Sequence, residues 1–298
     1  HRRHMSSPAA TPDADLVRAI GIRALTAAIV NATIGAGIFV LPATVAGELG
    51  TGAPVAYLVC AGLMLLVVGS FAIAGSRVNI SGGIFAYVGA AFGPFVGFLA
   101  GVMQMLSCVL AVAGVASALI ASLAVTWPAL GQGPGRWLVL GALFGGLALV
   151  NIRGVKQGAR TVEVVTLAKL LPLGVFVAVG AFAVMAKGVP MPTLPGLDAV
   201  GRSALVLIFA FLGAEVALIS SGEIRNPART VPASLFIALG FTTSFYLAIQ
   251  FVAQGVLGAE LRNVTDAPLA RAASEFLGAA GVTLMLVGAV VSMFGYVS

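Results

Sequence analysis

A series of long apolar stretches, each with very few charges, constrains this 298-residue chain more than any other feature. A helix needs about 20 apolar residues to cross the hydrocarbon core of a bilayer. Eight stretches approach or exceed this length, and we expect spans at residues 22–46, 53–76, 94–126, 136–151, 160–186, 200–221, 230–256 and 276–298. The chain is therefore predicted to be an all-α, polytopic membrane protein embedded in the lipid bilayer.

The composition supports this class and argues against several others. Hydrophobic residues make up 60% of the chain and charged residues 9%, which is far from the composition of soluble domains. The net charge of +6 lies in the short loops, so we expect no nucleic-acid partner. Cys60 and Cys108 lie in apolar spans and are expected to be free thiols. The only histidines, His1 and His4, precede Met5, so we expect no metal site and no cofactor.

Residues 1–21 are rich in Ser, Pro, Ala and Asp and are predicted to be a disordered tail. Lysine and arginine are enriched in cytoplasmic loops. A cytoplasmic N-terminus places ten of the sixteen basic residues inside and five outside, with Lys169 within a span. The inside set is Arg2, Arg3, Arg18, Arg23, Arg77, Arg153, Lys156, Arg160, Arg225 and Arg229; the outside set is Arg136, Lys187, Arg202, Arg262 and Arg271. We therefore expect a multi-pass protein of the cell (plasma) membrane with its N-terminus in the cytoplasm.

The first span carries Gly35 and Gly37 at its centre and Pro42 just beyond them. Each glycine costs a helix roughly 1 kcal/mol relative to alanine. Main-chain groups at bilayer depth must be packed in protein or line a polar cavity. We predict a helix that is broken at Gly35–Gly37, whose freed N–H groups face an anion such as a carboxylate. The alternative is a continuous helix that packs closely through its small residues.

The sixth span carries Gly213 and the ionisable Glu215 near its middle. A carboxylate at bilayer depth is costly, which favours a functional role, although a hydrogen bond to a neighbouring helix is the alternative. Two glycine-interrupted spans in corresponding places are typical of transporters built from inverted repeats. With a repeat of five helices, spans one and six correspond, and their breaks should meet at the substrate site.

Three stretches resemble motifs of the amino acid–polyamine–organocation (APC) superfamily of permeases. Gly35-Ala36-Gly37-Ile38-Phe39 is similar to its G-x-G-I-F signature, and Phe209-Ala210-Phe211-Leu212-Gly213-Ala214-Glu215 to its sixth-helix motif. The stretch from Glu223 to Pro232 (EIRNPARTVP) is similar to its loop between helices six and seven. In that loop Asn226-Pro227 should form a turn and Pro232 should lie in the first turn of helix seven. The loop either anchors the chain or contributes to a cytoplasmic gate through Glu223.

The resemblance covers the chain from about residue 20 and implies a five-plus-five inverted-repeat (LeuT-like) transporter fold. Residues 22–186 would form the first repeat, helices one to five. Residues 187–298 would form an incomplete second repeat, helices six to eight. Because the fold needs ten helices and we find eight spans, we expect a chain truncated to about eight transmembrane helices.

The family's substrates imply a secondary active transporter of amino acids that works by alternating access. Main-chain N–H groups would bind the substrate carboxylate, and carbonyls freed by unwinding would bind its ammonium group. The expected substrate-binding residues are Thr33, Ile34, Gly35, Ala36, Gly37, Ile38, Met105, Phe209, Ala210, Leu212 and Gly213. Phe209 matches the aromatic gate of the family's arginine–agmatine antiporters, unless it is an ordinary packing residue. Met105 stands where those antiporters carry an amide, which favours a neutral, aliphatic substrate side chain.

Two ionisable residues within spans are expected to take part in coupling or gating. A lysine buried among apolar groups can gain and lose a proton near neutral pH. By resemblance, Lys169 substitutes for the sodium ion of related transporters and contacts helix one near Gly35 and helix eight; alternatively it is a structural tether. Glu215 stands at the position of an acid-sensing glutamate in the antiporters. We see no acidic cage for sodium, so proton coupling or exchange is expected.

Other functions remain as alternatives. Antiport of polyamines or organic amines lies within the same class. An accessory or sensor subunit without transport, or an inactive fragment, lies outside it. An intramembrane enzyme would need paired carboxylates, a nucleophile with its base, or His-rich metal motifs within the spans. The only ionisable groups deep in the spans are Lys169 and Glu215, so no enzyme is expected.

Overall fold

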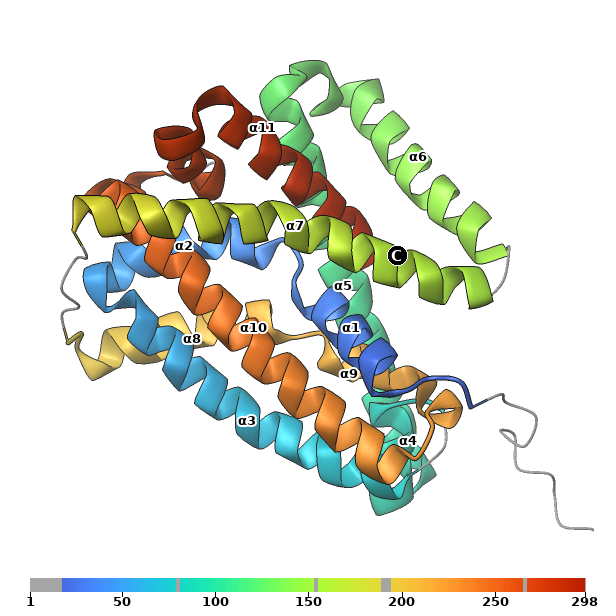
Figure 1. Ribbon diagram of the computed structural model, residues 1–298. Coiled ribbons are helices and arrows are strands. Elements are labelled where there is room, and N and C mark those ends of the chain that lie inside the picture. Colours follow the sequence, from blue (N-terminus) through green and yellow to red (C-terminus); the bar gives the residue numbers. More distant parts are fainter. Residues whose placement is uncertain (1–17, 79–80, 153–154, 189–193, 265–266, 298) are drawn as a thin grey trace, which may run out of the picture.

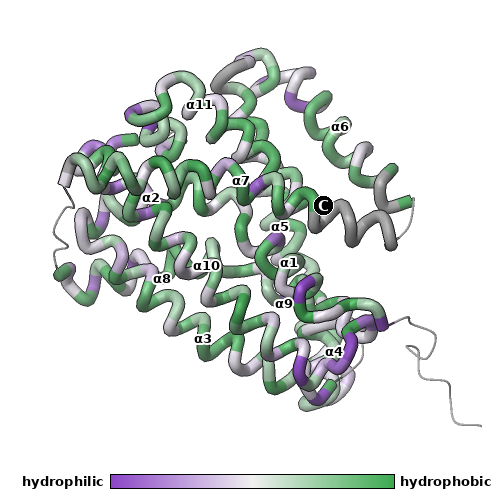
Figure 2. Tube along the Cα trace, in the orientation of Figure 1, coloured by the Kyte–Doolittle hydropathy of each residue, from purple (hydrophilic) through white to green (hydrophobic). Residues whose placement is uncertain are grey.

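The computed structural model describes residues 18–78, 81–152, 155–188, 194–264 and 267–297. Every element of four or more residues among them is a helix. Six helical segments are long and apolar enough to cross a membrane: Gly37–Arg77, Pro94–Ala124, Val164–Ala186, Leu197–Glu223, Pro227–Asn263 and Pro268–Val297. Ile22–Thr33 and Gly133–Leu149 are shorter apolar helices. Apolar residues predominate along the helices (Figure 2), and many large hydrophobic side chains are exposed, as expected for contact with lipid. The chain is thus an all-α polytopic membrane protein; the count of eight spans stays a prediction.

The first predicted span is two helices, α1 (Ile22–Thr33) and α2 (Gly37–Leu49), with a break at residues 34–36. The predicted interruption is therefore present, and the continuous helix is ruled out. A short turn, η1 (Gly50–Gly52), then reverses the chain into α3 (Ala53–Arg77). Gly50 has a φ of 51°, a conformation that favours glycine.

The middle of the chain begins with the short helix α4 (Ile84–Phe92), which packs against α5 (Pro94–Thr126). Their approach is close, because a Cβ at Gly97 would lie 2.7 Å from the Cα of Gly89. The chain continues through η2 (Pro128–Leu130), α6 (Gly133–Ile152) and α7 (Val155–Lys187).

The sixth predicted span is also broken, into α8 (Leu197–Phe211), α9 (Ala214–Ala217) and η3 (Leu218–Glu223). After it come α10 (Pro227–Leu257), η4 (Gly258–Asn263) and α11 (Pro268–Val297), which bends at Gly278. The expected place of Pro232 was wrong. Pro227 already begins α10, since proline suits a first helical position, and Pro232 therefore lies inside the helix.

Helices α3 and α10 lie side by side, as do α7 and α11; α1 packs between α10 and α7, and α8 packs against α3 and α2 (Figure 1). We call the end formed by Ile20, α4, η3 and the start of α10 the α4 end. The opposite end, formed by η1, η4 and the start of α8, is the η4 end.

Residues 18–21, expected as part of a disordered tail, instead pack at the α4 end. Ile20 donates its N–H to the Glu223 carbonyl (3.0 Å) and accepts the N–H of Arg225 (2.9 Å). The Arg225 side chain also donates from Nε to the carbonyl of Arg18 (2.9 Å). These bonds satisfy main-chain groups next to the buried Ile224 and give the segment a fixed place. Residues 1–17 of the expected tail lie outside the described residues.

Candidate functional site

The two breaks lie against each other. Gly213, in the second break, has a φ of 132°, and a Cβ there would lie 2.5 Å from the carbonyl carbon and oxygen of Ala32. A Cβ at Gly37 would lie 3.4 Å from the Cβ of Ala210. Only glycine allows the first of these approaches, so the meeting of the breaks depends directly on Gly213.

The first break leaves two buried N–H groups without an acceptor. The Gly35 N–H turns back to the Thr33 carbonyl (3.0 Å). Helix α2 begins only at Gly37, so its first N–H groups have no partner within the helix. Within the described part of the chain the N–H groups of Ala36 and Gly37 find no other acceptor, and both residues are buried. With the positive end of the α2 dipole, these donors favour an anion.

The side chain of Glu215 caps the second break. The Gly213 N–H donates to Oε2 of Glu215 (2.9 Å), so this N–H is occupied. Helix α8 ends at Phe211, and neither the Phe209 nor the Leu212 carbonyl accepts a main-chain N–H from the described residues. These two carbonyls are therefore open acceptors next to the first break.

Tyr246 of α10 joins the two breaks, and the sequence analysis missed it. Its hydroxyl lies 2.9 Å from the Ala210 carbonyl and 3.2 Å from the Thr33 carbonyl. The side chain is fully buried, and its ring packs edge-on against Phe211 with centroids 5.3 Å apart. A tyrosine in the middle of an apolar span needs a partner for its hydroxyl, which is the signal that could have identified it.

Lys169 of α7 lies at the end of α1, as expected. It is completely buried, and its Nζ donates to the carbonyls of Asn31 (2.5 Å) and Ile34 (2.7 Å). The Asn31 carbonyl can accept it because the Gly35 N–H, its usual helical partner, has turned away. On the other side, Ser292 of α11 donates to the carbonyls of Ile34 (3.1 Å) and Gly35 (3.3 Å). Lysine and serine thus hold the break from two different helices.

These bonds change part of the expected site. A carbonyl oxygen has two lone pairs. The Ile34 carbonyl already accepts from Lys169 and Ser292, and the Thr33 carbonyl from Gly35 and Tyr246. An ammonium group would therefore compete with these donors for the Thr33 and Ile34 carbonyls, and their part in substrate binding stays a prediction. The acceptors that remain belong to the second break.

The other predicted residues differ in their surroundings. The Ile38 side chain is buried in the core, whereas Phe209 and Leu212 are 49% and 40% exposed. Met105, on α5, is 60% exposed and takes no part in the contacts that join the breaks. The roles of Phe209 as a gate and of Met105 in a substrate pocket stay predictions.

A second buried polar cluster, also missed from the sequence, fixes α2 to its neighbours. Gln250 of α10 accepts from the Tyr57 hydroxyl (3.2 Å) and donates to the Pro42 carbonyl (3.4 Å). One helical turn further, Gln254 donates to the Gly50 carbonyl. All three side chains are at most 5% exposed, so α10 holds α2 through buried hydrogen bonds and is itself joined to α3 by Tyr57.

Comparisons with known proteins agree with the motifs and the two breaks. The serine/threonine exchanger SteT of Bacillus subtilis is 26% identical over 96% of this chain and 66% of its own length. A putative arginine/ornithine antiporter of Escherichia coli is 30% identical, over 93% of this chain and 63% of its own. The methylthioribose transporter of Bacillus subtilis is 31% identical with the same coverage. The chain spans less than two thirds of the length of these relatives.

A family model described as amino acid permease matches residues 20–298, which is nearly the whole chain. The family and these relatives are transporters, not enzymes. The chain therefore belongs to the amino acid permeases of the APC superfamily.

Proposed function

We propose that the protein is a secondary active transporter of amino acids that binds its substrate at the meeting point of the two broken helices. The observation that carries this proposal is a pair of opposed main-chain groups. Buried N–H donors of Ala36 and Gly37 lie in one break, and open carbonyls of Phe209 and Leu212 lie in the other. A zwitterion needs donors for its carboxylate and acceptors for its ammonium group, and this site offers both.

The substrate that fits best has a neutral side chain. The nearest carboxylate to the breaks along the chain, Glu215, already accepts the Gly213 N–H with Oε2, so a distal cationic group would share this carboxylate with the main chain. The relatives are named for exchange or transport of serine and threonine, of arginine and ornithine, and of methylthioribose. A dibasic substrate, or a polyamine, would have to share Glu215 with the Gly213 N–H, whereas a neutral side chain needs no such partner.

The architecture fits a five-plus-five inverted repeat of the LeuT-like type, with residues 22–186 in the first repeat and 187–298 in the second. Each half begins with a broken helix, α1–α2 and α8–α9, and the breaks adjoin. Alternating access would expose this meeting point first at one end of the molecule and then at the other. In the cell membrane the α4 end would face the cytoplasm.

Lys169 and Glu215 are the proposed coupling groups. Lys169 holds the carbonyls of the first break, and Glu215 holds the N–H of the second, so a proton gained or lost at either changes the bonds that fix the breaks. In the Glu215→Gln variant the amide oxygen can still accept the Gly213 N–H. We expect this variant to transport but to lose its dependence on acid pH. An unchanged profile of uptake against pH would contradict the role of Glu215.

The transport function is tested by uptake into liposomes that contain the complete protein. Labelled serine, isoleucine, arginine, putrescine and methylthioribose would be compared, with and without a proton gradient. We expect uptake of serine or isoleucine and none of putrescine. Binding of the amino acid but not of its methyl ester would support the carboxylate site. Uptake of putrescine alone would favour an amine antiporter, and no uptake of any compound would favour a non-transporting subunit.

A further inference from the structure

A cavity of about 380 Å³ opens at the η4 end, between α2 and η4. Val40, Thr44, Gly47 and Glu48 line it from α2, and Arg262 and Val264 line it from the opposite side. Its volume falls in the range of about 300–1,000 Å³ that is usual for small-molecule sites. Charged groups of both signs therefore face one cavity of suitable size.

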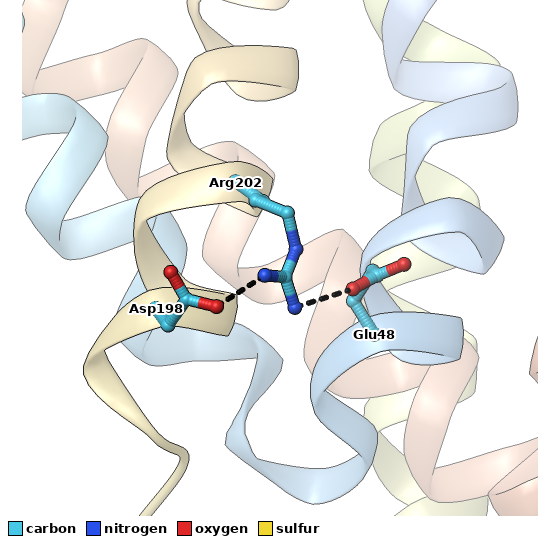
Figure 3. A network of polar contacts seen from close by, with 3 residues as sticks. All are labelled: Glu48, Asp198 and Arg202. Carbon is cyan, nitrogen blue, oxygen red and sulfur yellow. Dashed lines mark hydrogen bonds and ion pairs between the residues drawn. The ribbon is translucent and has the colours of Figure 1, made fainter.

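The Glu48 carboxylate is held in place but not saturated. Arg202 of α8 lies between Asp198 of its own helix and Glu48 of α2, as Figure 3 shows. Its Nη2 is 3.6 Å from Oε2 of Glu48, longer than the roughly 2.7–2.9 Å of a charge-assisted hydrogen bond. The carboxylate can thus accept further donors from the cavity.

Arg262 offers the complementary charge. Its side chain is exposed, and it forms no ion pair with any residue that the structure describes. A guanidinium group matches the geometry of a carboxylate and can bind it through two parallel hydrogen bonds. The cavity thus presents the Arg262 guanidinium group, which can bind an anion, and the Glu48 carboxylate, which can bind a cation in addition to Arg202.

The cavity leads towards the breaks. The exposed residues of α2 are Val40, Thr44, Gly47 and Glu48, and they form a single stripe because they recur every three or four residues. Val40 also lines a second, mainly apolar cavity together with Phe39 and Met293. Met293 follows Ser292, which binds the carbonyls of the first break. From Glu48 to Val40 the stripe covers about 12 Å of helix, and the buried Gly37 lies three residues beyond Val40.

We propose that the cavity at the η4 end is a capture site for the substrate: Arg262 binds the carboxylate of a zwitterionic amino acid and Glu48 binds its ammonium group, while Arg202 holds Glu48 in place. The proposal rests on the transport function and on the orientation inferred above. From this site the substrate moves along the α2 stripe to the breaks. A single cation or anion would satisfy only one side of the cavity, and a zwitterion satisfies both.

The test measures initial uptake of labelled serine from the η4 side and its efflux from the α4 side, using the complete protein in liposomes. In Arg262→Gln and in Glu48→Gln we expect the KM for uptake to rise about tenfold with an unchanged maximal rate, because oppositely charged groups raise the local substrate concentration. The KM for efflux should stay the same. High salt should raise the wild-type KM towards that of the variants, since it screens exposed charges.

Arg271→Gln is the matched control, because Arg271 is an exposed arginine that pairs with Glu275 on α11 (3.1 Å) and does not line the cavity. If Arg271→Gln raises the KM for uptake as much as the cavity variants do, the capture site is overturned. It is also overturned if neither Arg262→Gln nor Glu48→Gln changes this KM. A wild type that moves no labelled amino acid would instead overturn the transport function. Equilibrium dialysis with serine then decides the capture site by itself, since binding should weaken in Arg262→Gln and not in Arg271→Gln; equal binding in both would overturn it.

Discussion

Tyr246 places one hydroxyl group between two carbonyl oxygens that belong to different broken helices. The one hydroxyl proton is shared between these carbonyls, and its removal leaves the Ala210 carbonyl without its side-chain donor, at a cost of about 1–3 kcal/mol. We expect Tyr246→Phe to lower both the melting temperature and the affinity for substrate, because the breaks lose their link while the aromatic packing stays. Thermal unfolding in detergent and uptake kinetics measure the two effects.

Tyr57→Phe is the control for that experiment. This variant also removes one buried hydroxyl. The hydroxyl of Tyr57 bonds to the Gln250 side chain and to neither break. We expect a similar loss of stability with an unchanged substrate KM. Equal effects of the two variants on KM would mean that Tyr246 acts only through stability.

Lys169 is the second residue on which the breaks depend. Lys169→Met keeps most of the side-chain volume but leaves the Asn31 carbonyl without its side-chain donor and the Ile34 carbonyl with Ser292 alone. An unsatisfied buried acceptor costs about 1–3 kcal/mol, so we expect a lower melting temperature and loss of uptake. Leu167→Met, at a 70% exposed position of the same helix, should change neither measurement. Normal uptake by Lys169→Met would contradict a role in coupling.

At the scale of elements, the two breaks contact each other because Gly213 packs directly against the main chain of Ala32. Gly213→Ala would force a Cβ to within 2.5 Å of the main chain and would also place alanine at a φ of 132°. Gly50→Ala tests the backbone effect alone, since Gly50 also has a positive φ, 51°, but no atom lies within 4 Å of its Cβ position. Strain of this kind costs about 1–3 kcal/mol.

We therefore expect Gly50→Ala to lower the melting temperature slightly and to keep its uptake. Gly213→Ala should abolish uptake, because the second break must move away from the first. Uptake measured in parallel for the two variants decides the matter. If Gly213→Ala transports as well as Gly50→Ala, the close contact of the breaks is not needed for function.

At the scale of the whole molecule, the charges of the two ends predict its orientation. Arg18, Arg77, Arg225 and Arg229 gather at the α4 end, whereas Arg202 and Arg262 lie at the η4 end. Of the ten basic residues assigned to the inside, Arg2, Arg3 and Arg153 lie outside the described residues. The enrichment of arginine at the α4 end favours the cytoplasm for that side.

Cysteine labelling tests this orientation in intact cells. Ala228→Cys marks the α4 end and Asn263→Cys the η4 end, both at exposed positions, in a protein whose Cys60 and Cys108 are replaced by alanine. A thiol reagent that does not cross the membrane should label Asn263→Cys directly and Ala228→Cys only after the cells are permeabilised. The opposite pattern would reverse the orientation and with it the side of the proposed capture site.

The sequence by itself determined the class of the protein and the location of both breaks. The length of the apolar stretches predicts helices that cross a bilayer, and Gly35, Gly37 and Gly213 mark where those helices end, because both signals are local. The motifs identified the family for the same reason.

Only the tertiary structure decided which atoms occupy the breaks. Thr33 and Ile34 were predicted as free acceptors, yet Tyr246, Lys169 and Ser292 reach their carbonyls from three other helices. Arg262 and Glu48 likewise meet at one cavity although 214 residues of sequence separate them. Such pairings depend on how the helices pack, and the pattern of apolar and polar residues along one helix does not specify the partner that a buried polar group will find on another.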